Sequence, residues 1–163
     1  MIQEINKSPI ANREALQAMR EQILSERKNA DDVEHQPIRI CSGGGCLSSG
    51  SAEILAALKV SLEKRHLKSS VRIIECGCMG PCAAGPVMTV GHDQVFYRQI
   101  QPQDVDRIVE EHLQKGQPVE DLMWRSETDA SLQRRESDIE FFRHQDKIVL
   151  RNCGRIRPTS LED

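Results

Sequence analysis

Two glycine-rich runs, Cys41-Ser-Gly-Gly-Gly-Cys46 and Cys76-Gly-Cys78-Met-Gly-Pro-Cys82, contain five of the six cysteines in this chain. Each run follows a short apolar stretch, Pro37-Ile-Arg-Ile40 before the first and Val71-Arg-Ile-Ile74 before the second. Short stretches rich in Ile and Val and bounded by glycine are typical of β-strands. The sequence therefore predicts two strands, each of which runs directly into a cysteine loop.

A helix is predicted between these strands, from about Ser49 onward. Its apolar side chains recur on one face, at Ile54, Leu55, Leu58 and Leu62. A strand–helix–strand connection of this length favours parallel strands with a right-handed crossover. The two cysteine loops should then leave the sheet at the same edge, although they lie far apart in the sequence.

The next segments complete a small α/β domain. Val87-Met-Thr-Val90 and Gln94-Val-Phe-Tyr97 predict a hairpin, and a further helix is expected from Pro102 to Gly116. The buried face of that helix is assigned to Val105, Ile108, Val109 and Leu113. The predicted order is β-α-β-β-β-α, an α/β fold of the thioredoxin-like kind, with a mixed sheet and flanking helices.

The chain divides by composition into three parts. Residues 1–35 predict an N-terminal helical arm that begins near Ser8-Pro9, followed by a polar linker over residues 27–36. This arm is either solvated or a docking arm for a partner subunit. Residues 36–124 form the α/β domain. Residues 125–163 are expected to be a linker and the truncated start of another domain, apolar at Ile139, Phe141, Phe142 and 148–150.

Composition limits the partners of the chain. A net charge of -3, with one Trp and one Tyr, gives neither the basic surface nor the stacking platform of a nucleic-acid-binding protein. No signal pattern opens the sequence, and the longest apolar run, Ile54–Leu58, is far shorter than the roughly 20 residues of a membrane span. We therefore expect a cytoplasmic protein without direct membrane insertion. In that compartment clustered cysteines are usually metal ligands or redox groups.

Four cysteines, Cys41, Cys46, Cys78 and Cys82, are the candidate metal ligands, and an iron–sulfur cluster is the favoured cofactor. Such clusters take four deprotonated sulfur ligands, and glycines let the backbone approach the cluster closely. Zinc is an alternative, although neither pair has the two-residue spacing of a zinc knuckle. A thiol–disulfide enzyme would need Cys-x-x-Cys, and a phosphate loop would need Gly-Lys-Ser/Thr, and both motifs are absent.

The other cysteines and the histidines are given structural roles. Cys76 is expected to pack in the core, and Cys153 is expected to be a free thiol. The histidines lack ligand spacing, so we expect solvated side chains at His35, His66, His92, His112 and His144.

The cysteine motifs resemble a known family. Cys41-x4-Cys46 followed by Gly77-Cys78-Met-Gly-Pro-Cys82-Ala-Ala-Gly85-Pro86 is similar to the thioredoxin-like [2Fe-2S] domain of NADH dehydrogenases, the 24-kDa-type subunit. The same domain also occurs as an N-terminal extension of the flavoprotein subunits of NAD-linked hydrogenases and formate dehydrogenases. The resemblance covers about Pro37 to Trp124. It implies one [2Fe-2S] cluster, with Cys41, Cys46, Cys78 and Cys82 as its ligands.

The tail resembles a second part of the same complexes. The segment from Asp138 to Pro158 is similar to the start of the 51-kDa-type flavoprotein subunit. By resemblance, FMN and NAD would bind only in a missing remainder or in a partner subunit, so this chain is not expected to be catalytic alone. We expect an electron-transfer module whose partners are the flavoprotein and iron–sulfur subunits of a redox complex. The alternative is a non-redox docking module with zinc or no metal.

Overall fold

The computed structural model describes residues 11–31, 35–149, 151–154 and 156–159, in two separate units. The first unit contains helix α1 (Arg13–Asp31), which Asn12 caps by accepting the N–H of Ala15 at 2.8 Å. The predicted start at Ser8-Pro9 lies outside the described residues. The prediction of a linker from residue 27 was wrong, because the helix continues to Asp31. The residues around this point include Glu, Arg, Lys and Ala, which have high helix propensity. None of the described helices is long and apolar enough to cross a membrane.

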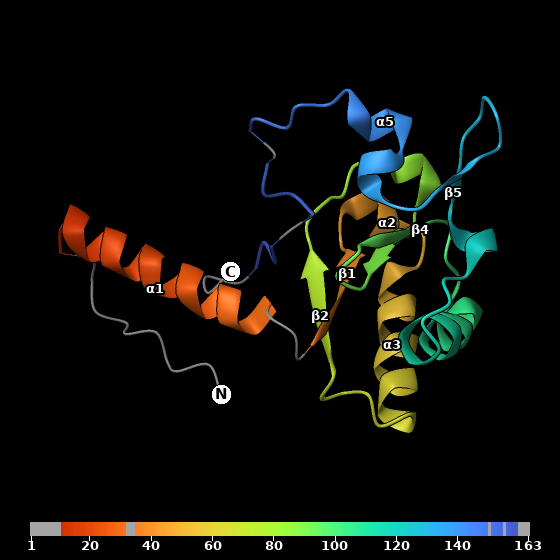
Figure 1. Ribbon diagram of the computed structural model, residues 1–163, viewed down its shortest axis with the longest axis horizontal. Coiled ribbons are helices and arrows are strands. Elements are labelled where there is room, and N and C mark those ends of the chain that lie inside the picture. Colours follow the sequence, from red (N-terminus) through yellow and green to blue (C-terminus); the bar gives the residue numbers. More distant parts are fainter. Residues whose placement is uncertain (1–10, 32–34, 150, 155, 160–163) are drawn as a thin grey trace. The chain divides into compact units, whose positions relative to one another are not determined.

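The second unit is built on a four-stranded mixed sheet with the strand order β2-β1-β3-β4 (Figure 1). Strands β1 (Gln36–Cys41) and β2 (Val71–Cys76) are parallel. Strands β3 (Met88–Val90) and β4 (Val95–Tyr97) form the predicted hairpin, and β3 pairs antiparallel with β1. The mixed sheet of the predicted α/β fold is therefore confirmed.

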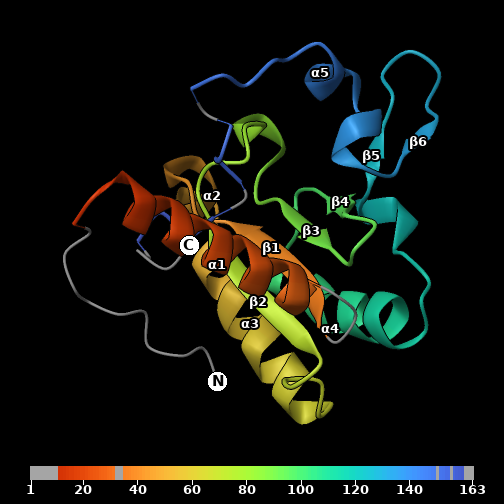
Figure 2. The ribbon, with the colours of Figure 1, turned by 60° about the vertical axis from the view of Figure 1, so that its left-hand side comes forward.

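Helices cover one face of this sheet. Helix α3 (Ser51–Lys64) connects β1 to β2 and packs beside the helical segment made of η2 (Pro102–Asp104), α4 (Val105–Arg107) and the π-helical η3 (Ile108–Gln114) (Figures 1 and 2). The side chains between them and the sheet form the larger core. Its fully buried members include Ile38, Ile40, Ile54, Leu58, Leu62, Met88, Val90, Val95, Tyr97, Val105, Ile108 and Val109.

Segments that we predicted to be a linker and a truncated domain pack on the rest of the unit. A two-stranded sheet joins β5 (Trp124–Arg125) to β6 (Leu132–Gln133), after the turn η4 (Glu120–Leu122). The turn η5 (Glu136–Asp138) and helix α5 (Glu140–Arg143) follow. Ile139 and Phe142 enter a second buried cluster with Phe96 and the cysteine loops. The described residues from Gln36 to Thr159 therefore belong to one compact unit.

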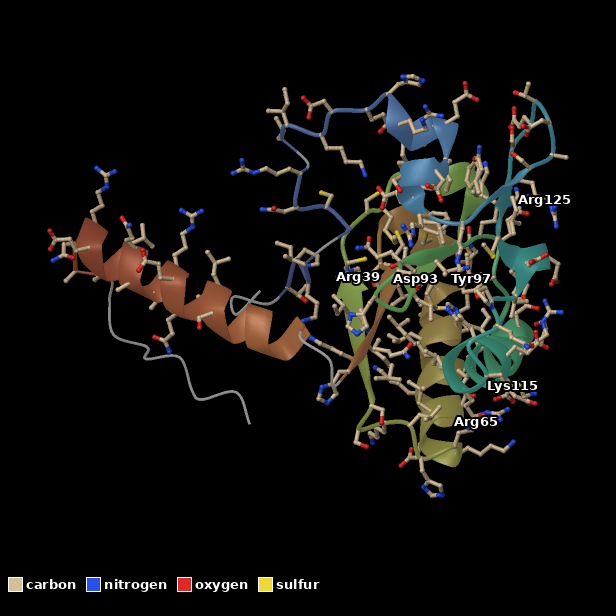
Figure 3. The ribbon with its side chains drawn as sticks, in the orientation of Figure 1. Arg39, Arg65, Asp93, Tyr97, Lys115 and Arg125 are labelled. Carbon is tan, nitrogen blue, oxygen red and sulfur yellow. The ribbon has the colours of Figure 1, made fainter. Side chains whose placement is uncertain are left out.

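His112 corrects one prediction. It is buried, not solvated, and its Nδ1 lies 2.9 Å from the hydroxyl of Tyr97, which also accepts the N–H of Val119 at 3.1 Å. Burial lowers the pKa of His112 below its usual value, against the opposing effect of nearby Asp93. Tyr97 and Asp93 are labelled in Figure 3. The spacing of His112 from Ile108 and Val109 places it on the buried face of the helix.

The neutral state of His112 predicts a pH dependence of stability. The pKa of His112 is lower in the folded protein than in the unfolded chain. Below about pH 6.5 the unfolded chain therefore binds a proton at this residue more readily than the folded protein does, and stability falls as the pH falls. Urea unfolding should show a smaller loss of stability between about pH 7.5 and 5.5 in His112→Gln than in the unchanged chain. The exposed His92→Gln is the control. Equal losses in all three proteins would contradict the prediction.

Candidate metal centre

The parallel pairing of β1 and β2 brings the two cysteine loops together. Cys41 ends β1, Cys76 ends β2, and the two residues are direct partners in the register. Just beyond them, the N–H of Ser42 donates to the carbonyl oxygen of Cys76 at 2.9 Å. Helix α2 (Gly44–Ser48) and the loop after β2 consequently lie at the same end of the sheet in both views (Figures 1 and 2). The predicted meeting of the two loops at one edge is confirmed.

Glycines allow the loops to touch through their backbones. A Cβ atom on Gly43 would lie 3.1 Å from both Cα and Cβ of Cys78, which is closer than nearly all real Cβ contacts. On Gly45 it would lie 3.3 Å from Cβ of Cys82. On Gly85, which follows the second loop, it would lie 3.1 Å from Sγ of Cys46. The close approach of the two cysteine pairs thus favours glycine at these positions.

The four predicted ligands are brought to one site as two pairs. Cys41 and Cys82 lie close enough to the Cys46 thiol to raise its pKa, and the same two residues lie close enough to Cys78 to raise the pKa of that thiol. Burial is the main cause that raises the pKa of Cys46 to about 12 and also raises the pKa of Cys78. These thiols stay protonated at neutral pH unless a metal ion replaces the proton.

The two pairs differ in their exposure to solvent. Cys41 and Cys46 are each 2% exposed, whereas Cys78 and Cys82 lie on the surface. Leu47, directly after Cys46, is also exposed. A group held by all four sulfurs would therefore be shielded on the β1 side and accessible on the side of the second loop.

Cys76 and Cys153 lie outside this set of four. Cys76 is fully buried, and its thiol donates to the carbonyl oxygen of Ile40 at 3.3 Å, so the predicted core position is confirmed. Burial raises the pKa of Cys76 to about 12. Cys153 is half-buried and has no disulfide partner among the described residues.

The chemistry of the site fits a binuclear cluster. Within the described ranges, no three or more Cys, His, Asp or Glu side chains are arranged to hold a single metal ion. A [2Fe-2S] cluster takes four cysteine sulfurs divided between two irons. Two adjacent pairs, Cys41 with Cys46 and Cys78 with Cys82, are the cysteines that match this requirement. Sequence reasoning missed the residues outside the loops that contact this site, Phe142, Gly154, Ile156 and Pro158.

Comparison with known proteins identifies the class of this fold and site. Residues 28–113 match the thioredoxin-like [2Fe-2S] ferredoxin family. A ferredoxin of Aquifex aeolicus named "Ferredoxin, 2Fe-2S" is 43% identical over 82 residues, 49% of this chain and 73% of that protein. The NADP-reducing hydrogenase subunit HndB of Solidesulfovibrio fructosivorans is 26% identical over 121 residues, 71% of this chain and 92% of that protein.

Solved structures agree with the sequence comparison. A thioredoxin-like [2Fe-2S] ferredoxin from Aquifex aeolicus, 32% identical, superposes with a TM-score of 0.52 over 61% of this chain and 99% of that chain. The fold and the family match thus define an iron–sulfur protein of the ferredoxin type. This chain belongs to the thioredoxin-like [2Fe-2S] ferredoxin family, and its cofactor is a [2Fe-2S] cluster.

Three consecutive glycines in the first loop are predicted to differ in how well they tolerate an added methyl group. Gly43→Ala and Gly45→Ala should lower the cluster content, because each methyl group pushes on Cys78 or Cys82, and overpacking costs about 1–3 kcal/mol. Gly44→Ala is the matched control, since a Cβ there meets nothing within 4 Å. Iron and sulfide per chain would be measured after identical anaerobic purification. A loss of cluster in Gly44→Ala as large as in Gly43→Ala and Gly45→Ala would contradict the view that glycine matters where the two loops meet.

Proposed function

We propose that Cys41, Cys46, Cys78 and Cys82 hold the [2Fe-2S] cluster and that the chain passes single electrons within an NAD(H)-linked oxidoreductase complex. The observation that carries the proposal is the meeting of two cysteine pairs at one sheet edge, with glycines where the loops touch. The cluster supplies the redox chemistry by gaining or losing one electron. The protein sets the position, exposure and potential of the cluster.

The chain's own residues act on the cluster by binding and by shielding. Deprotonated thiolates bind the iron, and binding therefore releases protons from thiols such as Cys46. Cys41 and Cys46 bind on the buried side, where water is excluded and the dielectric constant is low. Both factors tune the reduction potential, together with hydrogen bonds to the sulfurs.

Exposure also supports a proposal for the side of the protein on which a redox partner binds. Cys78 and Cys82 face solvent, so a partner's redox centre approaches the cluster most closely over the second loop. Leu47 and the glycines Gly44 and Gly45 are exposed nearby and offer little steric hindrance. This surface is therefore the proposed docking side for a flavoprotein or iron–sulfur subunit.

The wider complex is inferred from the relatives and from the tail. One relative is named as a subunit of an NADP-reducing hydrogenase, which supports a multi-subunit redox complex. The ferredoxin-type part of the chain carries no flavin or nucleotide site in our proposal. FMN and NAD are assigned to a partner or to a flavoprotein domain whose start resembles the segment from Asp138 to Pro158. The domain division at residue 124 and the cytoplasmic location stay predictions.

Serine substitutions test the ligand assignment. In the full chain, Cys41→Ser, Cys46→Ser, Cys78→Ser and Cys82→Ser should each lose the cluster or change its spectra, because a hydroxyl is a harder, less readily ionised ligand than a thiol. Visible absorption and EPR of the reduced protein would be recorded, with iron and sulfide counted. The unchanged chain should hold about two irons and two sulfides.

Two further variants serve as controls. Cys153→Ser and Cys76→Ala remove the remaining thiols and should keep the visible and EPR signals of the unchanged chain. An unaltered, full-strength signal in Cys78→Ser would rule out Cys78 as a ligand. Zinc in place of iron, reproduced after expression with ample iron and attempted reconstitution, would support the docking-module alternative.

A further inference from the structure

A segment far along the chain contacts the second cysteine loop. We define the C-terminal strap as the described residues between Ile139 and Thr159. In this strap the carbonyl oxygen of Ile156 accepts the N–H of Gly77 at 3.2 Å. Pro158 lies close to the same glycine, with its Cγ 4.0 Å from the position of a Cβ atom. The residue directly before Cys78 is therefore held by the strap through a backbone hydrogen bond and a side-chain contact.

The residue directly after Cys78 is also held by the strap. Met79 is 3% exposed, and a Cβ atom on Gly154 would lie 3.3 Å from its Cγ and 3.5 Å from its Cα. Gly154 has a φ of 78°, a left-handed conformation that side chains disfavour. Glycine at this position thus allows the strap to turn and to press its backbone against Met79.

A third contact anchors the strap in the core. A Cβ atom on Gly80 would lie 3.5 Å from Cε1 of Phe142. The Phe142 ring also packs edge-on against the Phe96 ring, with 5.8 Å between the ring centroids. Ile139, three residues earlier, is fully buried. The ammonium group of Lys147 lies over the Phe142 ring at 5.0 Å. The strap is consequently a packed part of this unit.

We propose that the C-terminal strap is a positioning element that fixes Cys78 and thereby sets the reduction potential and the stability of the bound cluster. The proposal rests on the assignment of Cys78 as a ligand. The strap contacts Gly77, Met79 and Gly80, on both sides of Cys78. None of the strap residues that make these contacts is a cluster ligand, so their effect is transmitted through the loop.

The physical reason is the conformational freedom of the loop itself. Gly77 and Gly80 flank Cys78 and Met79, and Gly80 has a φ of 119° that few other residues adopt. Glycine loses more conformational entropy on ordering than any other residue, so a loop with two glycines needs external contacts to hold one geometry. The strap provides them, and it also covers Met79, the residue next to Cys78. Water would stabilise the more negatively charged reduced state, so uncovering this side should raise the reduction potential.

Two glycine substitutions in the full chain test the strap. Gly154→Ala places a methyl group against Met79 and should lift the strap from the loop. Gly116→Ala is the matched control, because Gly116 also has a positive φ, 69°, but a Cβ there meets nothing within 4 Å. We expect a higher midpoint potential and a several-fold faster loss of iron to a chelator in Gly154→Ala, with both values unchanged in Gly116→Ala.

A pair of phenylalanine substitutions gives a second, milder measurement. Phe142→Leu keeps an apolar side chain but removes the ring edge that lies over Gly80, whereas Phe141→Leu changes a neighbouring ring that is half exposed. Hydrogen exchange followed by mass spectrometry should show faster exchange in peptides containing Gly77–Pro81 for Phe142→Leu only. The midpoint potential of this variant should shift in the same direction as that of Gly154→Ala.

The outcomes separate this proposal from the proposed function. If Gly154→Ala and Phe142→Leu hold the cluster with the potential, iron-loss rate and loop exchange of their controls, the strap proposal is overturned and the ligand assignment stands. If Cys78→Ser holds its cluster with the spectra of the unchanged chain, the ligand assignment fails and the strap proposal fails with it.

Discussion

The site depends on the parallel pairing of β1 with β2. Parallel strands end at the same edge of a sheet, and here the register sets Cys41 directly opposite Cys76, so both chains leave the sheet side by side. A register shift of one residue would turn every side chain of a strand to the other face. The same shift would bury or misdirect one cysteine loop. The apolar side chains that fix this register, such as Ile38 and Ile40, therefore also fix the geometry of the metal centre.

Close approach of the two loops is the second constraint. The loops meet at Gly43 and Gly45, where a Cβ atom would press tightly on the opposite cysteines. The two pairs of cysteines differ in their exposure to solvent. The first pair is buried, whereas the second pair lies on the surface. For an electron-transfer protein, the position and exposure of the cluster are the main properties that the chain can control.

The strands, the crossover and the meeting of the two cysteine loops could be predicted from sequence because their signals are local. A short stretch of sequence is enough to recognise the junction of a strand with its loop, the spacing of the glycines and the apolar face of α3. Helix α2 was missed because its first turn consists of glycines, which favour loops, and its stability comes from packing of Cys46. His112 was misjudged as solvated because only its lack of metal-ligand spacing was weighed, although its spacing from Ile108 matches the buried face.

Contacts of the tail could not be predicted because they are not local. Residues 125–138 are polar and lack periodicity, and such composition ordinarily marks a linker. A few buried anchors are nevertheless enough to hold a polar segment, here Ile139 and Phe142, which pack beside Phe96. The anchored segment then covers Met79, a residue of the second cysteine loop. A boundary drawn from composition alone would thus separate the ligand loop from the residues that cover it, because a site is completed by packing rather than by proximity in the sequence.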